Sequence, residues 1–337
     1  MSTTGSFDFQ SRTAQTKPAR TYSEVPTLSL RSYTQGTPQE KQTFVSELFD
    51  ALKYYGFIIL KDHGVNTGML DTSYDQLETL FNLPTETKKS YISKVGGNQR
   101  GYTPFGKEHA KNAQVSDLKE FWHVGRELPD GHKYKAQFPD NIWPKEVNGF
   151  HETMTELYRS LDVVGDAMLE ALTGPLKVEK DYFKKMTVDG NSILRLLHYP
   201  PIPDSVDPRC IRAAAHEDIN LITILVAATT SGLELLDRDG KWLPIETDKN
   251  NLIVDAGDML ARITNDIIPS TTHRVVNPAD GTNGHRYSMP FFIHPNPEAM
   301  LTCLDSCKGD GAKWPPILAQ DFLMQRLHEI GLMKSDK

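Results

Sequence analysis

The chain has 337 residues, of which 38% are hydrophobic and 24% charged. This length and composition are typical of a folded protein with one or two structural units, and they exclude a wholly disordered or fibrous chain. The 37 basic and 44 acidic side chains give a net charge of -7, so no general electrostatic attraction draws the protein to nucleic acid or to anionic lipid. We therefore expect a small-molecule partner, with no nucleic acid and no membrane involved.

No stretch of the sequence has the roughly 20 apolar residues that a membrane-crossing helix needs. The opening residues MSTTGSFDFQ are polar where a secretory leader would be apolar, so a cytoplasmic location is the default expectation. The three cysteines, Cys210, Cys303 and Cys307, are an odd number in a large chain, unlike a disulfide framework. Cys303 and Cys307 could form half of a metal site, but no second cysteine pair exists, so we expect free thiols.

The first part of the chain alternates extended and helical patterns. Residues 1–24 are rich in polar residues and poor in large apolar ones, which predicts a flexible tail. Residues 25–140 are predicted to form an N-terminal α/β region. Its expected elements are an extended run at 26–31, helices at 39–55 and 67–81, a strand at 57–60, an exposed loop at 98–106 and a strand at 117–129.

A long helical pattern leads into the second half. Large apolar residues recur every three or four positions from 145 to 173, so residues 141–185 are predicted to form supporting helices. From 186 to 300 short β-type runs alternate with turn signals, which is typical of a jelly roll; they include LIVDAGDML and YSMPFFIH. Residues 301–337 are expected to hold a last helix, at about 318–330, and a tail. The predicted fold class is therefore α+β and mainly β.

His216 and Asp218 stand two positions apart at the start of an apolar strand. Alternate residues of a strand point to one face, so both side chains could reach one metal ion while Glu217 faces away. In a chain with 11 histidines such a pair means little alone. It gains weight from His273 in a later strand, because two histidines and one carboxylate form the facial triad, which leaves positions open on iron(II).

Arg286 and Ser288 lie on one face of the strand that follows His273. A guanidinium offers a planar fork to a carboxylate, so Arg286 could hold a dicarboxylic cosubstrate at the end remote from the metal. An unpaired charge in this otherwise apolar strand would be costly. We therefore prefer a ligand-binding role for Arg286 over a surface ion pair.

As a set, these motifs resemble the isopenicillin N synthase-like branch of the 2-oxoglutarate- and iron(II)-dependent dioxygenases. VPTLSL, YYGFIILKDHGV, RGYTPFG and LKEFWHVGRE are similar to the N-terminal region of that family, and HED, the later histidine and RYS to its catalytic core. The resemblance extends from about residue 26 to 295. It implies a double-stranded β-helix, a cupin-like jelly roll, with His216, Asp218 and His273 as the iron ligands.

The resemblance also implies the cosubstrates and the reaction. Arg286 and Ser288 would grip the C5 carboxylate of 2-oxoglutarate, and Tyr199 would add a hydrogen bond. Dioxygen would be consumed, 2-oxoglutarate would yield succinate and carbon dioxide, and a C–H bond of a small organic substrate would be hydroxylated, desaturated or closed into a ring. The protein then supplies positioning, because the hard chemistry belongs to the cofactor.

The substrate contacts are less well defined by the sequence. Arg195 alternates inward with Tyr199, where it would suit a substrate carboxylate or a carbonyl-rich ring, the cosubstrate, or a structural pair. NSILRLLHYP, GDMLARITND and THRVVNP are similar to the fungal thymine 7-hydroxylases. Asn220 is a further candidate substrate contact, because it stands where those enzymes carry a substrate-facing tyrosine; this difference argues against thymine itself. Phe292 could stack on a flat substrate or fill the core.

Other histidines and one loop also bear on the pocket. His63 and His198 are interpreted as structural, with a place in the pocket as the alternative for His198. Phe105 and the loop around Tyr102 could form part of a lid, since glycines at both ends of this loop would serve as hinges.

Two other functions fit parts of the pattern. An oxidase of the isopenicillin N synthase type also carries an Arg-x-Ser pair, but uses it for the carboxylate of a peptide or amino-acid substrate and needs no 2-oxoglutarate. A jelly-roll protein that binds metal without turnover would release no succinate. The sequence gives no indication of the oligomeric state.

Overall fold

The computed structural model describes residues 24–94, 99–107, 116–207, 209–278 and 282–329. The helices are α1 (Leu30–Thr34), α2 (Pro38–Tyr55), α3 (Thr67–Phe81), α4 (Thr85–Ser90), α5 (Phe150–Thr173), α6 (Tyr182–Thr187), α7 (Asp258–Ile263) and α8 (Ala319–Glu329), with a 3-10 turn η1 (Asp305–Cys307). The strands are β1 (Thr27–Ser29), β2 (Phe57–Lys61), β3 (Gly101–Thr103), β4 (Glu120–Gly125), β5 (Ile193–Tyr199), β6 (Ala213–His216), β7 (Ile222–Val226), β8 (Leu233–Leu236), β9 (Trp242–Pro244), β10 (Leu252–Ala256), β11 (His273–Val275), β12 (Arg286–Ile293), β13 (Met300–Leu301) and β14 (Ile317–Leu318).

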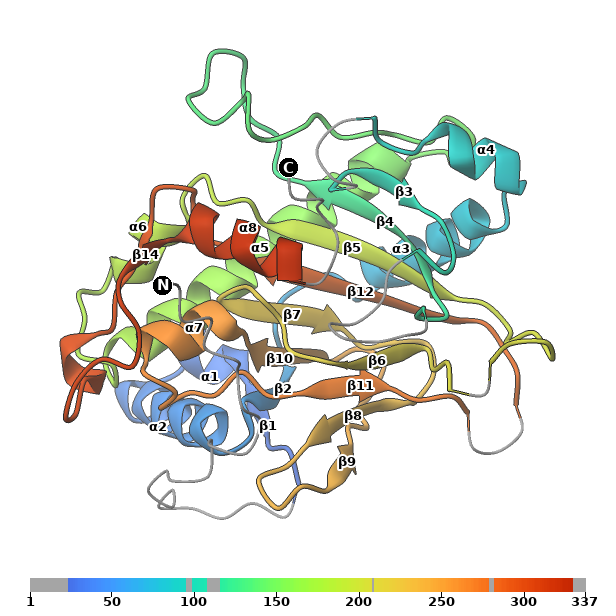
Figure 1. The fold of residues 1–337 in the computed structure, drawn as a ribbon. Coiled ribbons are helices and arrows are strands. Elements are labelled where there is room, and N and C mark those ends of the chain that lie inside the picture. Colours follow the sequence, from blue (N-terminus) through green and yellow to red (C-terminus); the bar gives the residue numbers. More distant parts are fainter. Residues whose placement is uncertain (1–23, 95–98, 108–115, 208, 279–281, 330–337) are drawn as a thin grey trace, which may run out of the picture.

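Two sheets form the centre of the molecule (Figure 1). The large sheet has the strand order β1-β2-β10-β7-β12-β5-β4-β3, and the small sheet the order β6-β11-β8-β9. Apolar side chains from both sheets share one buried cluster, for example Phe57, Leu197 and Ile253 from the large sheet and Leu235 and Val275 from the small one. The sheets therefore face each other, and the predicted mainly-β jelly-roll core is confirmed.

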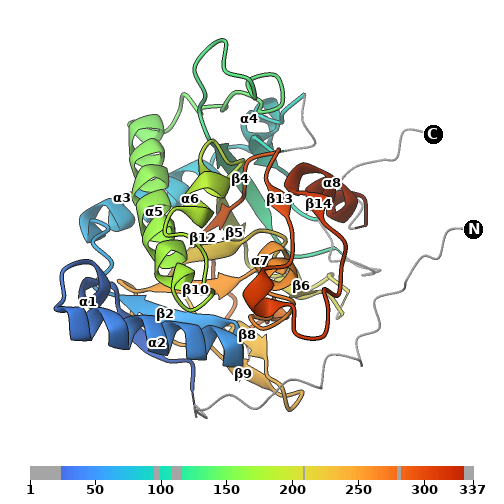
Figure 2. The same ribbon diagram turned by 90° about the vertical axis from the view of Figure 1, so that its left-hand side faces the viewer.

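Helices cover the outer face of the large sheet (Figure 2). Apolar residues of α2, α3 and α5 join one large core with the outward-facing side chains of the sheet, such as Leu194 and Phe291. At Gly165 of α5 a Cβ atom would lie 1.9 Å from the Cδ1 atom of Ile293, so the absence of a side chain lets α5 approach β12 closely. The inner face of the large sheet is not covered by these helices, and its side chains lie between the two sheets.

The long helix starts later than the sequence pattern predicts. Its apolar repeat begins at about residue 145, whereas α5 begins at Phe150. Gly149, just before it, has φ of 69°, a left-handed conformation that no α-helix continues through. The first residues of the apolar repeat, before Phe150, thus pack against the same core without being helical.

Two segments predicted as extended are partly helical. Of the run VPTLSL, only Thr27–Ser29 form a strand, and α1 begins at Leu30. In LIVDAGDML the strand ends at Ala256, and Asp258–Ile263 form α7. The residues DMLARI favour helix by intrinsic propensity, and the extended Gly257 separates the two elements.

The predicted exposed loop at 98–106 is in part a buried strand. Gly101–Thr103 form β3, which pairs with β4 and is buried throughout. Tyr102 donates a hydrogen bond from its hydroxyl group to Glu120, so its assignment to a lid is wrong. Phe105 is 39% exposed, and residue 98 lies outside the described residues.

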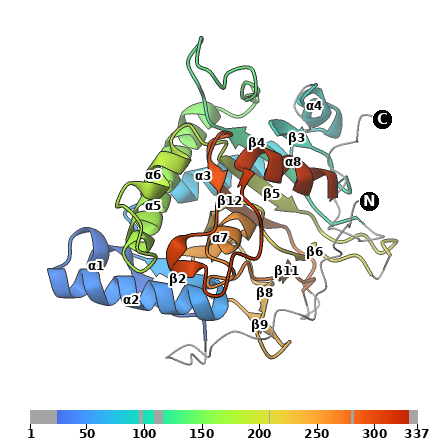
Figure 3. The same cartoon turned by 60° about the vertical axis from the view of Figure 1, so that its left-hand side comes forward.

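The predicted tail, apart from Glu24, and the last residue of the predicted C-terminal helix lie outside the described residues. Helix α8 lies next to α7 (Figure 3), to which Arg326 connects it through an ion pair with Asp258. The cysteines Cys210, Cys303 and Cys307 are buried free thiols, as predicted. No helix of the described ranges is long and apolar enough to span a bilayer.

Candidate metal and cosubstrate site

Three potential metal ligands converge between the two sheets. His216 ends β6 and pairs with His273 at the start of β11, and Asp218 follows two residues after His216. The Nε2 atoms of His216 and His273 lie 3.9 and 3.8 Å from Oδ1 of Asp218. All three ligand atoms lie within 4.8 Å of one another, close to the separation expected of atoms that each bind one ion at about 2 Å. The predicted triad is thus assembled.

Backbone carbonyls orient both imidazoles. Nδ1 of His216 lies 2.7 Å from the carbonyl oxygen of Ala214, and Nδ1 of His273 lies 3.1 Å from that of Thr271. A carbonyl only accepts, so each Nδ1 carries the proton and each Nε2 keeps its lone pair for a metal. This is the support that metal-binding histidines ordinarily receive.

Hydrogen bonds at the beginning of β7, a strand of the large sheet, hold Asp218 in place. Thr223 of β7 donates a hydrogen bond from its hydroxyl to Oδ2 of Asp218. The amide of Asn220 donates to the carbonyl of Ile222 at 2.7 Å and to Oγ1 of Thr223 at 3.1 Å. Asn220 has no exposed surface, so its observed contacts support the turn that carries Asp218, and the predicted contact of its side chain with substrate has no support.

The electrostatics match the protonation states that a metal requires. Burial and the neighbouring His273 lower the pKa of His216. Burial raises the pKa of Asp218, but the two histidines and the Thr223 hydroxyl outweigh it and lower the pKa overall. Both shifts favour the neutral imidazole of His216 and the carboxylate of Asp218, the forms in which these groups bind metals.

Asp255 is a member of the site that the sequence analysis missed. It lies on β10 opposite Thr223 and is fully buried. Burial and the nearby Asp218 carboxylate raise the pKa of Asp255 well above the usual range, which favours its protonated form. A single acidic residue within the apolar run LIVDA was the signal that could have identified it.

Arg286 lies buried on the inner face of β12, with 2% of its surface exposed. Its Nε atom is 3.2 Å from the carbonyl oxygen of Thr230, and Nη1 is 3.5 Å from Oγ of Ser288. Tyr199 pairs with it across β5 and β12, and its ring centroid is 5.0 Å from the guanidinium carbon. Within the described ranges, no carboxylate lies at ion-pair distance from Arg286.

A buried guanidinium without a counter-ion costs several kcal/mol. The arrangement of Arg286, Ser288 and Tyr199 therefore fits a carboxylate ligand, which would supply the missing charge and accept from the guanidinium. The two predicted clusters, the triad and the Arg-x-Ser pair with its tyrosine, both exist in the fold, and they suit iron(II) and a dicarboxylic cosubstrate.

Arg195 lies among aromatic side chains near the metal site. Its guanidinium carbon is 4.4 Å from the Phe121 ring centroid and 5.3 Å from that of Phe292, and its Nε donates to Nε2 of His123 at 2.7 Å. Its charge also contributes to the lowered pKa of Asp218. Arg195 and Phe292 are thus adjacent, as their predicted place in one pocket requires.

The two histidines interpreted as structural have structural contacts. Nδ1 of His198 lies 2.7 Å from the Glu120 carboxylate, and its Nε2 lies 2.8 Å from Nδ1 of His285. The ring of His63 bonds to the carbonyl of Asn250 and to the backbone amide of Val65. The alternative that His198 lines the pocket is not supported, because it occupies the strand face opposite to Tyr199.

Two family models match the chain. Residues 25–146 match the model described as the N-terminal region of non-haem dioxygenases in morphine synthesis, and residues 190–295 match that of the 2OG-Fe(II) oxygenase superfamily. The 2-oxoglutarate-Fe(II) type oxidoreductase hxnY of Emericella nidulans is 30% identical over 84% of this chain and 83% of its own length. The 2-oxoglutarate-dependent dioxygenase caaD of Aspergillus niger is 30% identical over 82% of this chain and 86% of its own.

Solved structures of similar proteins indicate the same family. A protein described as belonging to the 2OG-Fe(II) oxygenase family, from Caulobacter crescentus, is 45% identical, with a TM-score of 0.82 over 92% of this chain and 100% of its own. The thymine 7-hydroxylase of Neurospora crassa, in complex with alpha-KG and thymine, is 27% identical, with a TM-score of 0.80 over 90% of this chain and 96% of its own.

Proposed function

The chain belongs to the 2OG-Fe(II) oxygenase superfamily, and from this premise we propose which of its residues bind the metal, the cosubstrate and the substrate. The protein is a 2-oxoglutarate- and iron(II)-dependent dioxygenase. The proposed iron ligands are His216, Asp218 and His273, and the proposed contacts of the 2-oxoglutarate C5 carboxylate are Arg286, Ser288 and Tyr199. The observation that carries the proposal is the convergence of the three ligand atoms within 4.8 Å of one another.

The protein's own contribution is orientation and charge. When bound, iron(II) and 2-oxoglutarate supply the redox chemistry: dioxygen is consumed, succinate and carbon dioxide are released, and a C–H bond of the substrate is oxidised. The carbonyls of Ala214 and Thr271 hold the imidazoles with Nε2 free, and Thr223 fixes Asp218. Arg286 fixes the distal end of the cosubstrate, so that its opposite end can reach the metal.

The proposed substrate is a small organic molecule that lies against Arg195 and Phe292. Arg195 supplies a positive charge and hydrogen-bond donors, and the rings of Phe121 and Phe292 supply flat apolar surface. The Neurospora crassa thymine 7-hydroxylase binds thymine and 5-formyluracil in solved complexes. That likeness supports a planar substrate here, whereas the buried Asn220 offers no contact in place of the tyrosine of the thymine 7-hydroxylases.

An anaerobic titration tests the proposal. Iron(II) is added to the metal-free protein, followed by 2-oxoglutarate, and the visible charge-transfer band of the chelate is recorded. We expect one iron per chain, and a band that requires both additions and is absent from the variant Asp218→Ala. A protein that binds iron but forms no band with 2-oxoglutarate would instead be an oxidase of the isopenicillin N synthase type.

A second measurement tests turnover and the substrate class. Succinate release is followed with nucleobases, amino acids, short peptides and phenolic compounds. We expect stimulation by a planar heterocycle or phenol, and a weaker response in the variant Arg195→Gln. Stimulation by a compound without a ring, unaffected by that variant, would contradict the proposed substrate contacts.

A further inference from the structure

His294 lies close to the metal centre without being one of its ligands. It follows β12 directly, two residues beyond Phe292, and is buried with 8% of its surface exposed. The Asp218 carboxylate interacts electrostatically with both His294 and Arg195. His294 does not belong to the group of ligand atoms within 4.8 Å of one another. It is therefore a neighbour of the metal centre and of the proposed substrate contacts.

The hydrogen bonds of His294 define which ring nitrogen carries the proton. Nδ1 lies 3.3 Å from the carbonyl oxygen of Phe292, two residues earlier. Since a carbonyl only accepts, Nδ1 donates and Nε2 keeps a lone pair. The metal ligands His216 and His273 have this same arrangement, with Nδ1 against the carbonyl two residues earlier. In His294, however, the Nε2 atom has no hydrogen-bond partner among the described residues.

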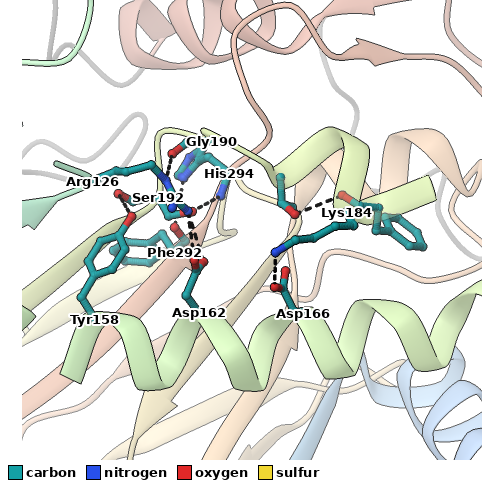
Figure 4. Close-up of polar contacts among 11 residues, drawn as sticks. Arg126, Tyr158, Asp162, Asp166, Lys184, Gly190, Ser192, Phe292 and His294 are labelled. Atoms are coloured by element: carbon teal, nitrogen blue, oxygen red, sulfur yellow. Dashed lines mark hydrogen bonds and ion pairs between the residues drawn. The ribbon is translucent and has the colours of Figure 1, made fainter. Parts of the chain in front are cut away.

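The backbone around His294 is held rigidly (Figure 4). Its amide donates to Oγ of Ser192 at 3.2 Å, and a Cβ atom at Gly190 would lie 2.1 Å from its carbonyl oxygen. Arg126 donates to the carbonyl of Gly190 at 2.8 Å, and the Tyr158 hydroxyl donates to that of Ser192 at 3.1 Å. The Nε2 acceptor is thus fixed in place before any ligand binds.

Burial also keeps Nε2 of His294 unprotonated, so that this atom can accept a hydrogen bond. It lowers the pKa of His294 to about 4, so the ring is neutral throughout the physiological pH range. Nε2 of His294 is not among the fully buried side-chain atoms that lack a hydrogen-bond partner, so part of its surface remains open to a ligand that donates to it.

We propose that Nε2 of His294 accepts a hydrogen bond from the substrate, which therefore carries an N–H or O–H donor as well as an oxygen acceptor for Arg195. This inference rests on the proposed function, because it assumes that the substrate lies beside Arg195 and Phe292. It adds a requirement that those two residues do not impose, since neither accepts a hydrogen bond. Planar lactams and hydroxylated aromatic rings meet the requirement, whereas derivatives in which every N–H or O–H is methylated do not.

Matched pairs of probes test this requirement. Uracil and thymine are compared with their N1,N3-dimethyl derivatives, 2-pyridone with N-methyl-2-pyridone, and 4-hydroxybenzoate with 4-methoxybenzoate. The measurement is anaerobic calorimetric titration of the protein loaded with iron(II) and 2-oxoglutarate. We expect at least one donor compound to bind about tenfold more tightly than its methylated partner, the value of one good hydrogen bond. The variant His294→Phe should abolish this difference, and His294→Gln, which retains an acceptor, should preserve part of it.

His151→Phe is the matched control, because His151 is half exposed and lies on α5, away from the metal site. It should bind every probe as the wild type does. A donor preference that survives in His294→Phe would overturn the inference, as would the absence of binding by every donor compound in a protein whose 2-oxoglutarate band is intact. A missing band would instead overturn the proposed function, and the inference with it.

Discussion

Replacing Arg286 tests how the cosubstrate is held. The variant Arg286→Ala removes a buried guanidinium that lies beside Ser288 and Tyr199 and has no carboxylate at ion-pair distance within the described ranges. A two-pronged contact with the C5 carboxylate consists of two charge-assisted hydrogen bonds, each worth about 1.5–3 kcal/mol. We therefore expect a loss of at least about 3 kcal/mol, which weakens 2-oxoglutarate binding by a factor of about 100 or more.

The assay compares two ligands, so that binding at the metal and binding at the arginine are separated. 2-Oxobutyrate has the same carboxylate and ketone for the metal as 2-oxoglutarate but lacks the distal carboxylate. In anaerobic titrations the wild type should strongly prefer 2-oxoglutarate, whereas Arg286→Ala should bind both ligands about equally and retain its iron. Arg286→Lys should be intermediate, because it keeps the charge but loses the planar fork.

Arg209→Ala is the control for these titrations. Its side chain is 67% exposed and pairs with Asp207 at the surface, so its loss should leave both affinities unchanged. If Arg286→Ala kept the wild-type preference for 2-oxoglutarate over 2-oxobutyrate, the distal carboxylate would have to be held elsewhere. The role of Arg286 would then be structural.

Three further predictions concern the supports of the site and the fold. Thr223→Val, which removes the hydroxyl that bonds Asp218, should weaken iron(II) binding about 10- to 100-fold in a metal titration, and Thr223→Ser should restore it. Burial lowers the pKa of His294 to about 4 in the folded protein, whereas in the unfolded chain it is about 6.5. Between these two pH values the imidazole is protonated in the unfolded chain but not in the folded protein. Over that range the stability of the metal-free protein should fall by about 3 kcal/mol more than that of His294→Phe in urea unfolding, at about 1.4 kcal/mol per pH unit; parallel curves would contradict this. Glu120→Gln leaves the buried Lys88 ammonium, 2.9 Å from Glu120, without its counter-ion, and should cost about 3–5 kcal/mol in the same assay. Glu298→Gln, at an exposed ion pair, should change the stability little.

The parts of the site that depend on local spacing were predictable from the sequence. The two-residue step from His216 to Asp218 and that from Arg286 to Ser288 each place two side chains on one face of a strand, whatever the rest of the fold. The apolar runs around them were sufficient to predict the strands β5, β7 and β12. The beginning of α5 was not predictable from its apolar repeat, because the left-handed Gly149 interrupts a pattern that its neighbours continue.

The position of Asp255 beside Thr223 and Asp218 could not be predicted, because it depends on the register between distant strands. Thr223 and Asp255 face each other only because β7 and β10 pair in one particular register. Shifting β10 by one residue against β7 would turn Asp255 to the opposite face of the sheet. Likewise, Asn220 is close in sequence to Asp218, but its orientation follows from the turn into β7, where its amide bonds to Ile222. Its position two residues after Asp218 did not reveal this supporting role.

The length of β12 explains why the cosubstrate and the substrate contacts can vary independently. Arg286 and Phe292 are six residues apart on one strand, which corresponds to about 20 Å between their backbones. An extended arginine side chain and a five-carbon dicarboxylate each reach only about 6 Å. A cosubstrate gripped by Arg286 therefore cannot extend to the far end of the strand, where Phe292 and His294 lie. Substitutions at that end should alter the choice of substrate and leave the affinity for 2-oxoglutarate unchanged.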